Sequence, residues 1–279
     1  MTEWRILPFE RAAAAKNMAI DEAVFRKNIR GESPPTLRFY GWRSPALSIG
    51  YFQDYRKEVD DEACRKFGVE VVRRPTGGKA VLHEQELTYA VVAGADTGLF
   101  PPDILKTYLV IGRCLAEGLA GVGIRAEMKE DGRRPPDGAL QSACFSFPSR
   151  YELLVGDRKI CGSAQMRSQG AFLQHGSLLT AFDPLRTCEV MLPHRRLEKE
   201  ADRLRNAVTS VGEQAGPALD EEGLRRALRE GFERTLGIRL REGMLTPGEQ
   251  ALRDELVEKK YGREEWNREG KRGEWISGL

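Results

Sequence analysis

The chain has 279 residues, of which 41% are hydrophobic and 31% are charged, and its formal net charge is +2. This composition predicts a folded α/β protein with a substantial core and excludes a largely disordered chain. The balanced charge also excludes the strong positive field of a non-specific nucleic-acid binder. No apolar run approaches membrane-spanning length, and the N-terminus lacks the apolar core of a signal peptide, so we expect no membrane contact.

The cysteine and histidine content bears on the compartment and on metal binding. Five cysteines, an odd number at irregular spacing, argue against a secreted disulfide framework and favour the reducing cytoplasm. With three histidines and no Cys-x-x-Cys motif, we expect no metal site.

The first half of the chain alternates between helical and strand patterns. Apolar spacing predicts a helix over residues 12–29, closed by Gly31, and a second, short helix that ends at Gly68. A longer helix follows Pro101-Pro102, with Ile104, Tyr108, Leu115 and Leu119 on its buried stripe. Strands are predicted over residues 36–40, 46–52, 69–73 and 87–93.

The second half begins with a hairpin and then becomes helical. Residues 130–139 are polar and rich in Pro and Gly, which predicts a surface loop. Gly156-Asp157 suits a type II′ turn between strands over 150–155 and 158–164. A strand is predicted over 171–179, and helices over 220–236 and 246–261. We therefore predict α/β (α+β) architecture, with mixed or antiparallel sheets flanked by helices over 1–215 and a helical C-terminal portion over 216–279.

Residues 71–83 (VVRRPTGGKAVLH) form the most informative segment, because a predicted strand runs into adjacent glycines and a lysine. Gly77 and Gly78 can bring backbone amides close to a ligand, and Arg74 and Lys79 add positive charge. An ordinary hairpin turn is the alternative interpretation. A P-loop is excluded, because Ala80 stands where that motif requires Ser or Thr.

Two further residues are candidates for chemistry. Cys144 follows the polar loop in QSACFSFPS, which favours a place near a cleft, although a small buried hydrophobe is the alternative. Lys159 stands in RKICGSA, where strand alternation groups it with Cys161 and Ser163 on one face. It is either a solvent-facing strand residue or a lysine beside the ligand, and hairpin register pairs it with Leu154.

Three spaced motifs resemble the lipoate and biotin protein ligase superfamily: RRPTGGKAVLH (73–83), the lysine in DRKICGSA (157–164) and QHGSLL (174–179). The ATP-dependent ligases of this superfamily usually have a third glycine in the loop and then His-Asp-x-Gly-Asn. Here Lys79 follows the second glycine, and the later segment reads HEQELTY. Together with ACFSFPSRYEL and the late KYGREEWN (260–267), this segment resembles the cysteine-dependent octanoyl-acyl carrier protein:protein octanoyltransferases, the LipM group.

This resemblance implies an acyltransferase with a lipoate/biotin protein ligase-like catalytic domain. The expected donor is octanoyl acyl carrier protein. The expected acceptor is a lysine of a lipoyl domain, such as the glycine cleavage H protein or a 2-oxoacid dehydrogenase E2 domain. Cys144 would carry the acyl chain, Lys159 would lower the pKa of its thiol, and neither ATP nor a metal cofactor would be needed.

The same resemblance implies a substrate site built from the two glycine-bearing segments and two histidines. The expected residues are Arg74, Gly77, Gly78, Lys79, His83, Gly162, Ser163, Ala164, His175 and Gly176. Val71, Val81 and Leu82 could contribute to an acyl tunnel. The alternatives are an ATP-dependent lipoate-protein ligase and, behind it, a lipoyl-domain amidotransferase or a non-catalytic carrier-domain binder.

Overall fold

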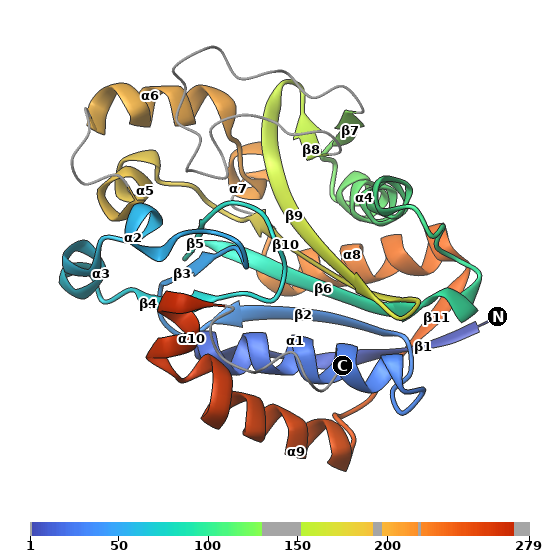
Figure 1. Ribbon diagram of the computed structural model, residues 1–279. Helices are drawn as coiled ribbons and strands as arrows, with labels where there is room; N and C mark the ends of the chain where they lie inside the picture. The colour runs from blue at the N-terminus through green and yellow to red at the C-terminus, as the bar shows by residue number, and fades with distance from the viewer. Residues whose placement is uncertain (1, 130–151, 192–196, 217–218, 271–279) are drawn as a thin grey trace.

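The structure is a computed structural model that describes residues 2–129, 152–191, 197–216 and 219–270. Figure 1 shows a layered α/β molecule in which helices cover both faces of a large curved sheet. The strands are β1 (Thr2–Ala12), β2 (Thr36–Trp42), β3 (Ala46–Ile49), β4 (Glu70–Arg73), β5 (Val81–His83), β6 (Glu86–Gly94), β7 (Glu127–Lys129), β8 (Glu152–Val155), β9 (Arg158–Ser168), β10 (Ala171–Leu179) and β11 (Ile238–Glu242). The helices are α1 (Ala14–Ile29), α2 (Tyr55–Glu58), α3 (Asp61–Phe67), η1 (Ala95–Thr97), α4 (Ile104–Ala120), α5 (Pro184–Met191), α6 (Leu197–Ala207), α7 (Val211–Ala215), α8 (Glu221–Leu236), α9 (Pro247–Leu256), η2 (Val257–Tyr261) and α10 (Glu264–Glu269).

The large sheet has eight strands in the order β11-β1-β2-β6-β10-β9-β8-β7. Strand β1 pairs in parallel with both β11 and β2, and the remaining pairs are antiparallel. Antiparallel β6, β10 and β9 form its centre, where long strands bring distant parts of the chain into register. The fold is therefore mixed α/β, as the sequence predicts.

Each face of the sheet buries its own apolar core. Helices α4 and α8 pack together over one face, where Leu115 and Phe232 are buried against Tyr89 and Phe172 of the strands. Helix α1 covers the opposite face, and α9 packs on α1 from outside. Burial on both faces removes the sheet from water, which is the dominant stabilising contribution for such a layered fold.

A second, three-stranded sheet has the order β4-β3-β5 and lies beside the α1 face of the large sheet. Its core includes Leu47, Ile49 and Leu82, and α3 and α5 pack near it. The chain leaves β4 at Arg73 and re-enters at Val81, so the glycine-bearing loop connects these two strands. This small sheet therefore fixes both ends of the loop.

Most predicted elements agree with the structure to within a few residues. The predicted strand over 171–179 coincides with β10, and helix α8 begins at an Asp220 cap that accepts a hydrogen bond from the Gly223 amide. Helix α9 opens with the expected Thr246-Pro247 pair, which forms a full capping box with Glu249. The Gly156 corner has φ +61°, as the first central position of a type II′ turn requires.

Other predictions are wrong in detail. The short helix predicted over 58–67 begins only at Asp61, as α3, because Asp60 caps it after the extended Val59, and the separate helix α2 precedes it. Ile104, expected on a buried stripe, is 47% exposed in the first turn of α4. The portion after residue 216 is helical but also supplies β11, which extends the large sheet beside β1. Among the described residues, no helix has the length and apolar character needed to cross a membrane.

Candidate active site

A small cavity of about 50 Å³ lies between the α1 face of the large sheet and the loop that joins β4 to β5. Small residues of β9 and β10 form its floor, and aromatic and aliphatic side chains form much of its wall. The lining residues are Met18, Tyr40, Trp42, Ser48, Arg74, Gly78, Val81, His83, Thr88, Gly162, Ser163, Ala164, His175, Gly176 and Ser177.

Arg74 shapes the loop above the cavity. Its buried guanidinium donates hydrogen bonds to the backbone oxygens of Gly77 (2.8 Å), Lys79 (2.7 Å) and Ser48 (3.1 Å). Because these carbonyls turn toward Arg74, the loop closes tightly, and Gly78 takes φ +95°, a conformation that favours glycine. Arg74 therefore organises the loop through its backbone.

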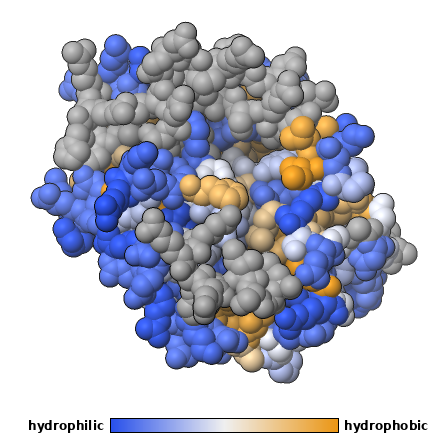
Figure 2. Space-filling view, in the orientation of Figure 1, coloured by the Kyte–Doolittle hydropathy of each residue, from blue (hydrophilic) through white to orange (hydrophobic). Residues whose placement is uncertain are grey.

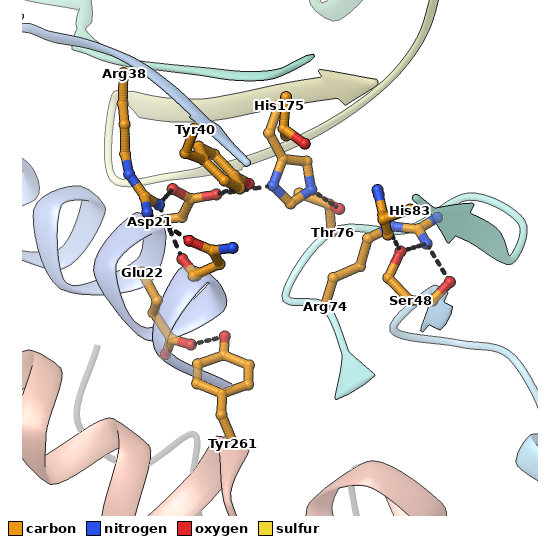
Figure 3. Close-up of polar contacts among 12 residues, drawn as sticks. Asp21, Glu22, Arg38, Tyr40, Ser48, Arg74, Thr76, His83, His175 and Tyr261 are labelled. Carbon is orange, nitrogen blue, oxygen red and sulfur yellow. Dashed lines mark hydrogen bonds and ion pairs between the residues drawn. The ribbon is translucent and has the colours of Figure 1, made fainter. Parts of the chain in front are cut away.

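A polar chain joins the same loop to α1 across His175, which is buried on β10 (Figure 3). His175 Nε2 lies 2.7 Å from Thr76 Oγ1, and its Nδ1 lies 3.1 Å from Asp21 Oδ2. Asp21 also pairs with Arg38 at 2.7 Å and accepts a hydrogen bond from the Tyr40 hydroxyl at 2.8 Å. This chain fixes the loop relative to both the helix and the sheet.

The charges in this chain are set by burial and by neighbouring groups. Burial lowers the pKa of His175 below its ordinary value, so the imidazole is neutral at neutral pH. Burial alone would raise the pKa of Asp21, but Arg38 and His175 outweigh it and hold that pKa below its ordinary range. Asp21 is therefore a carboxylate that accepts hydrogen bonds from its neighbours.

His83 closes another side of the cavity. Its ring stacks on Trp42 with centroids 4.1 Å apart, and its Nε2 lies 2.7 Å from Ser48 Oγ. Its Nδ1 lies 2.8 Å from Glu86 Oε1, and Glu86 also accepts a hydrogen bond from Ser177. Although burial alone would raise the pKa of Glu86, His83 and nearby hydroxyls lower it below the ordinary value. A buried carboxylate thus orients His83.

Lys159 lies on the face of the large sheet that carries the cavity, and not on the face expected from simple alternation. In the β8–β9 hairpin, Leu153 pairs with Cys161 but Leu154 pairs with Lys159, so Ile160 is an extra residue. This bulge places Lys159 and Cys161 on opposite faces. The predicted grouping of Lys159 with Cys161 is wrong, whereas its predicted pairing with Leu154 is confirmed.

Lys159 is buried, with 1% exposure, and forms an ion pair of 2.6 Å with Glu152. The interpretation of Lys159 as a solvent-facing strand residue is therefore wrong. Paired charges of this kind are costly to desolvate and usually have a specific function or a specific packing role. Lys159 itself does not line the cavity, which begins at Gly162 on the same strand.

Cys144 lies outside the described residues. The four described cysteines, Cys64, Cys114, Cys161 and Cys188, are all buried. Burial raises their thiol pKa values to about 11 for Cys64 and Cys188 and to about 12 for Cys114 and Cys161. For Cys161 the Lys159 charge only partly offsets burial. These four cysteines are therefore protonated and poorly reactive at neutral pH.

The cavity brings together most of the residues expected at a substrate site. Eight of the ten line it: Arg74, Gly78, His83, Gly162, Ser163, Ala164, His175 and Gly176. Gly77 lines a neighbouring cavity on the other side of the loop, and the half-buried Lys79 lines neither. Of the apolar tunnel candidates, Val81 lines the cavity, whereas Val71 and Leu82 pack within the small sheet.

Several residues of the site were missed by sequence reasoning. Asp21, Glu86 and Glu152 hold His175, His83 and Lys159 through buried carboxylates. Asp21 and Glu152 stand within a predicted helix and a predicted strand, and Glu86 directly precedes the strand predicted over 87–93. A charged residue at or beside a position expected to be buried was therefore the available signal. Within the residues that the structure describes, no group of three or more His, Cys, Asp or Glu side chains is arranged to hold a metal ion.

The architecture and cavity define a class of α/β proteins in which a glycine-bearing loop lies over a small cavity on one face of a mixed sheet. The family model for the lipoyl protein ligase A/B catalytic domain matches residues 13–233. Octanoyltransferase LipM of Symbiobacterium thermophilum is 44% identical over 272 residues, covering 95% of this chain and 98% of the relative. Octanoyltransferase LipM of Bacillus subtilis is 37% identical, covering 95% and 97% of the two chains.

Solved structures agree with this assignment. A crystal structure of lipoate-protein ligase A bound with ATP superposes with a TM-score of 0.79 at 30% identity, covering 96% of this chain and 99% of the other. A bipartite lipoate protein ligase from Thermoplasma acidophilum, studied with its E2 lipoyl domain, superposes with a TM-score of 0.80 at 30% identity. The match covers 99% of this chain and 100% of the other. The chain therefore belongs to the lipoyl protein ligase A/B catalytic domain family. The predicted grouping with the octanoyltransferases is confirmed by its full-length relatives.

Proposed function

We propose that this octanoyltransferase moves an octanoyl group from octanoyl acyl carrier protein, through an acyl-Cys144 intermediate, to a lysine of a lipoyl domain. The acceptor would be a domain such as the glycine cleavage H protein or a 2-oxoacid dehydrogenase E2 domain. The observation that carries the proposal is the cavity between the Gly78 loop and the glycine-bearing floor of β9 and β10. Its mixed apolar and hydroxyl lining suits an alkyl chain that ends in a carbonyl.

The identity of the nucleophile is supported by the state of the other cysteines. A thiolate is the reactive form, and burial raises the thiol pKa of each of the four described cysteines well above neutral pH. Cys144, the fifth, is therefore the candidate that this chain offers for an acyl-thioester intermediate.

In the first step, the Cys144 thiolate attacks the carbonyl carbon of the donor thioester. A new C–S bond forms to Cys144, the C–S bond to the pantetheine arm breaks, and the departing thiolate takes a proton from the Lys159 ammonium. One thioester replaces another, so this step needs neither ATP nor a metal ion.

In the second step, the amine of the acceptor lysine attacks the acyl-Cys144 carbonyl. A C–N bond forms, the C–S bond breaks, the Cys144 thiolate is regenerated, and the nitrogen, once bonded to the carbonyl carbon, releases a proton to water. The acceptor lysine is protonated in water near neutral pH, so a base must remove a proton before attack. Neutral Lys159, left by the first step, would accept it. Two features support this role: the bulge at Ile160, which turns Lys159 to the cavity face, and its pairing with Glu152.

The proposal is tested by incubating the protein with octanoyl acyl carrier protein in the absence of ATP. Intact-mass spectrometry is expected to show one octanoyl adduct that hydroxylamine removes. Cys144→Ala should abolish the adduct, and Cys161→Ala, the matched control at a buried cysteine, should retain it. An adduct that persists on Cys144→Ala would refute the assignment of the nucleophile. Binding without an adduct or turnover would instead indicate a carrier-domain binder.

A second candidate function, ATP-dependent lipoate ligation, is favoured by one observation: a structural neighbour at 30% identity is a ligase bound with ATP. The two functions differ in their substrates. Free octanoate or lipoate with ATP and Mg²⁺ would modify a lipoyl domain only in the ligase. Octanoyl acyl carrier protein alone suffices for the transferase. Transfer that requires ATP would favour the ligase.

Both carriers are expected in the cytoplasm, and the cysteine usage of the chain agrees with that compartment. The neighbour from Thermoplasma acidophilum was studied with its E2 lipoyl domain, which supports a lipoyl domain as acceptor. Pull-down of purified lipoyl domains and of acyl carrier protein would check each partner separately.

A further inference from the structure

The last segment of the described chain contacts two elements that position the cavity, strand β4 and helix α1. It comprises η2 and α10, residues 257–269, and we name it the C-terminal clasp. Figure 1 shows α10 beside β4, and η2 contacts α1, although both partners are far away in sequence. These two elements carry the loop and the Asp21–His175 contact, so the clasp lies where it can set their relative position.

The first set of contacts is made with Arg73, the residue that precedes Arg74 and the loop. Strand β4 is an edge strand, and its outer backbone groups pair with α10 in place of another strand. The Arg73 amide donates to Asn267 Oδ1 at 2.9 Å, and the Arg73 carbonyl accepts from Trp266 Nε1 at 3.0 Å. Both backbone groups of one residue are thus held by two adjacent clasp residues.

The Arg73 side chain links α10 to the turn after β3, which lies next to the loop. It is 2% exposed and donates to the carbonyls of Trp266 (3.2 Å) and Arg268 (3.1 Å) near the end of α10. It also donates to the carbonyls of the turn after β3, at Gly50, Tyr51 and Gln53. A planar guanidinium can serve both sets of acceptors at once.

That turn is in direct contact with the loop. The Tyr51 amide donates to the Thr76 carbonyl at 2.9 Å. A Cβ placed on Gly50 would lie 2.0 Å from the Gly78 carbonyl oxygen, so the two backbones are as close as glycine allows. The path from α10 through Arg73 and this turn therefore reaches Gly78 over the cavity.

The second set of contacts is made with Glu22 of α1, which is next in sequence to Asp21. Glu22 is buried and pairs with Lys260 at 2.7 and 3.0 Å, and it accepts a hydrogen bond from the Tyr261 hydroxyl (Figure 3). The Lys260 ammonium lies 4.0 Å from the Trp266 ring centroid, which joins η2 to α10. Asp21 faces the loop through His175, and Glu22 faces the clasp.

We propose that the C-terminal clasp is a positioning element for acyl transfer, in which Arg73, Lys260 and Trp266 hold the Gly77-Gly78 loop at its working distance from β9. This proposal rests on the proposed function, because the loop is taken to be one wall of the octanoyl site. No residue of the clasp lines the cavity that contains His175 and Arg74. The clasp residues act through the backbone of the loop.

The test uses two substitutions, one at the Arg73 contact and one at the Glu22 contact. Trp266→Phe keeps an aromatic ring but removes the Nε1 donor to Arg73. Lys260→Met removes the ammonium that pairs with Glu22, and Lys259→Met is its matched control, since Lys259 is exposed in the same helix. We expect both test variants to lower kcat/KM about tenfold through misplacement of the loop, with Lys259→Met unchanged.

Hydrogen–deuterium exchange supplies a readout that does not depend on activity. Amides of residues 76–80 are expected to exchange about tenfold faster in Trp266→Phe and Lys260→Met, while amides of β10 keep their protection. Equal loss of protection throughout the protein, or unchanged exchange in 76–80, would overturn the proposal. If the wild-type chain formed no octanoyl adduct, the proposed function would fail, yet the exchange experiment would still decide whether the clasp orders the loop.

Discussion

Lys159 and Glu152 form a buried ion pair, 2.6 Å long, on the face of the sheet that holds the cavity. Replacing Lys159 by Met leaves the Glu152 carboxylate buried without that cation. Removing one partner of a buried pair costs about 3–5 kcal/mol, so we expect the free energy of unfolding of Lys159→Met to fall by about that amount. Urea unfolding followed by circular dichroism measures it.

The double variant Lys159→Met/Glu152→Leu separates this cost from catalysis. With both charges replaced by apolar groups, most of the lost stability should return, because hydrophobic replacement of a buried pair is often neutral. The rate of octanoyl transfer should stay at least about 100-fold below that of the wild-type protein, since the proton-transfer group is still missing. A double variant as unstable as the single one would contradict the ion-pair explanation.

The environment of His175 predicts a pH dependence of stability. Its pKa is lowered in the folded protein by burial, whereas an unfolded histidine titrates near 6.5. Below about pH 6.5 the unfolded state therefore binds more protons than the folded state, and stability falls as the pH is lowered. We expect the free energy of unfolding, measured by urea unfolding at each pH, to be constant from about pH 8 to about 7 and to decrease between about pH 6.5 and 5.5.

The control for this pH effect is His175→Asn, which has no group that titrates in the same range. This variant should be less stable at pH 7.5 but should lose little further stability by about pH 5.5. Asp21, Glu22 and Glu86 have lowered pKa values, so their contributions disappear only at more acidic pH. An unchanged slope between pH 7 and 5.5 in His175→Asn would assign the effect to another group.

Gly50 is predicted to be sensitive because of its distance to the loop. In Gly50→Ala the new Cβ would meet the Gly78 carbonyl oxygen at 2.0 Å, which forces the backbone of the loop to move. We expect kcat/KM for octanoyl transfer to fall by about 100-fold, since a displacement of about 1 Å can have that effect. Gly248→Ala, whose Cβ would meet only the flexible Lys27 side chain at 3.3 Å, is the control and should leave the rate unchanged.

The local features of this site could be predicted from sequence, because adjacent glycines and apolar spacing act over a few residues. The loop at Gly77-Gly78 and strand β10 are of this kind. The orientation of Lys159 could not, because one extra residue at Ile160 reverses the face and only the pairing with β8 reveals it. The β1–β11 pair was missed for a similar reason, since its strands come from opposite ends of the chain.

The buried acids also show the difference between local patterns, which the sequence reveals, and contacts between distant segments, which it does not. Asp21 and Glu22 are neighbours in sequence, yet Asp21 contacts His175 and Glu22 contacts Lys260. Local pattern places both on a helix. Their partners come from β10 and η2, which only the folded chain brings to α1. The sequence therefore predicted most of the residues that line the cavity, but it did not predict the buried carboxylates that hold those residues in place.

The last prediction concerns how an acidic carrier protein reaches the site. The arginines of α8 are mostly neutralised, since Arg225 pairs with Glu221 and Arg229 with Glu233 on the same helix. Arg133 and Arg134 belong to the polar segment over 130–139, outside the described residues, and we expect their positive charge to attract an acidic carrier protein. Because salt screens such steering, kcat/KM for octanoyl acyl carrier protein should fall about 3- to 10-fold between about 0.05 and 0.3 M salt.

Variants then identify the responsible arginines. Arg133→Glu/Arg134→Glu should lower kcat/KM at low salt and flatten its salt dependence, whereas Arg225→Gln/Arg229→Gln should change neither by more than about twofold. Steady-state kinetics with a small octanoyl-pantetheine donor supply the control, because a donor without the carrier protein is not steered and should be indifferent to both pairs of substitutions. Rates with the full carrier that do not vary with salt would show that charge steering plays no part in its docking.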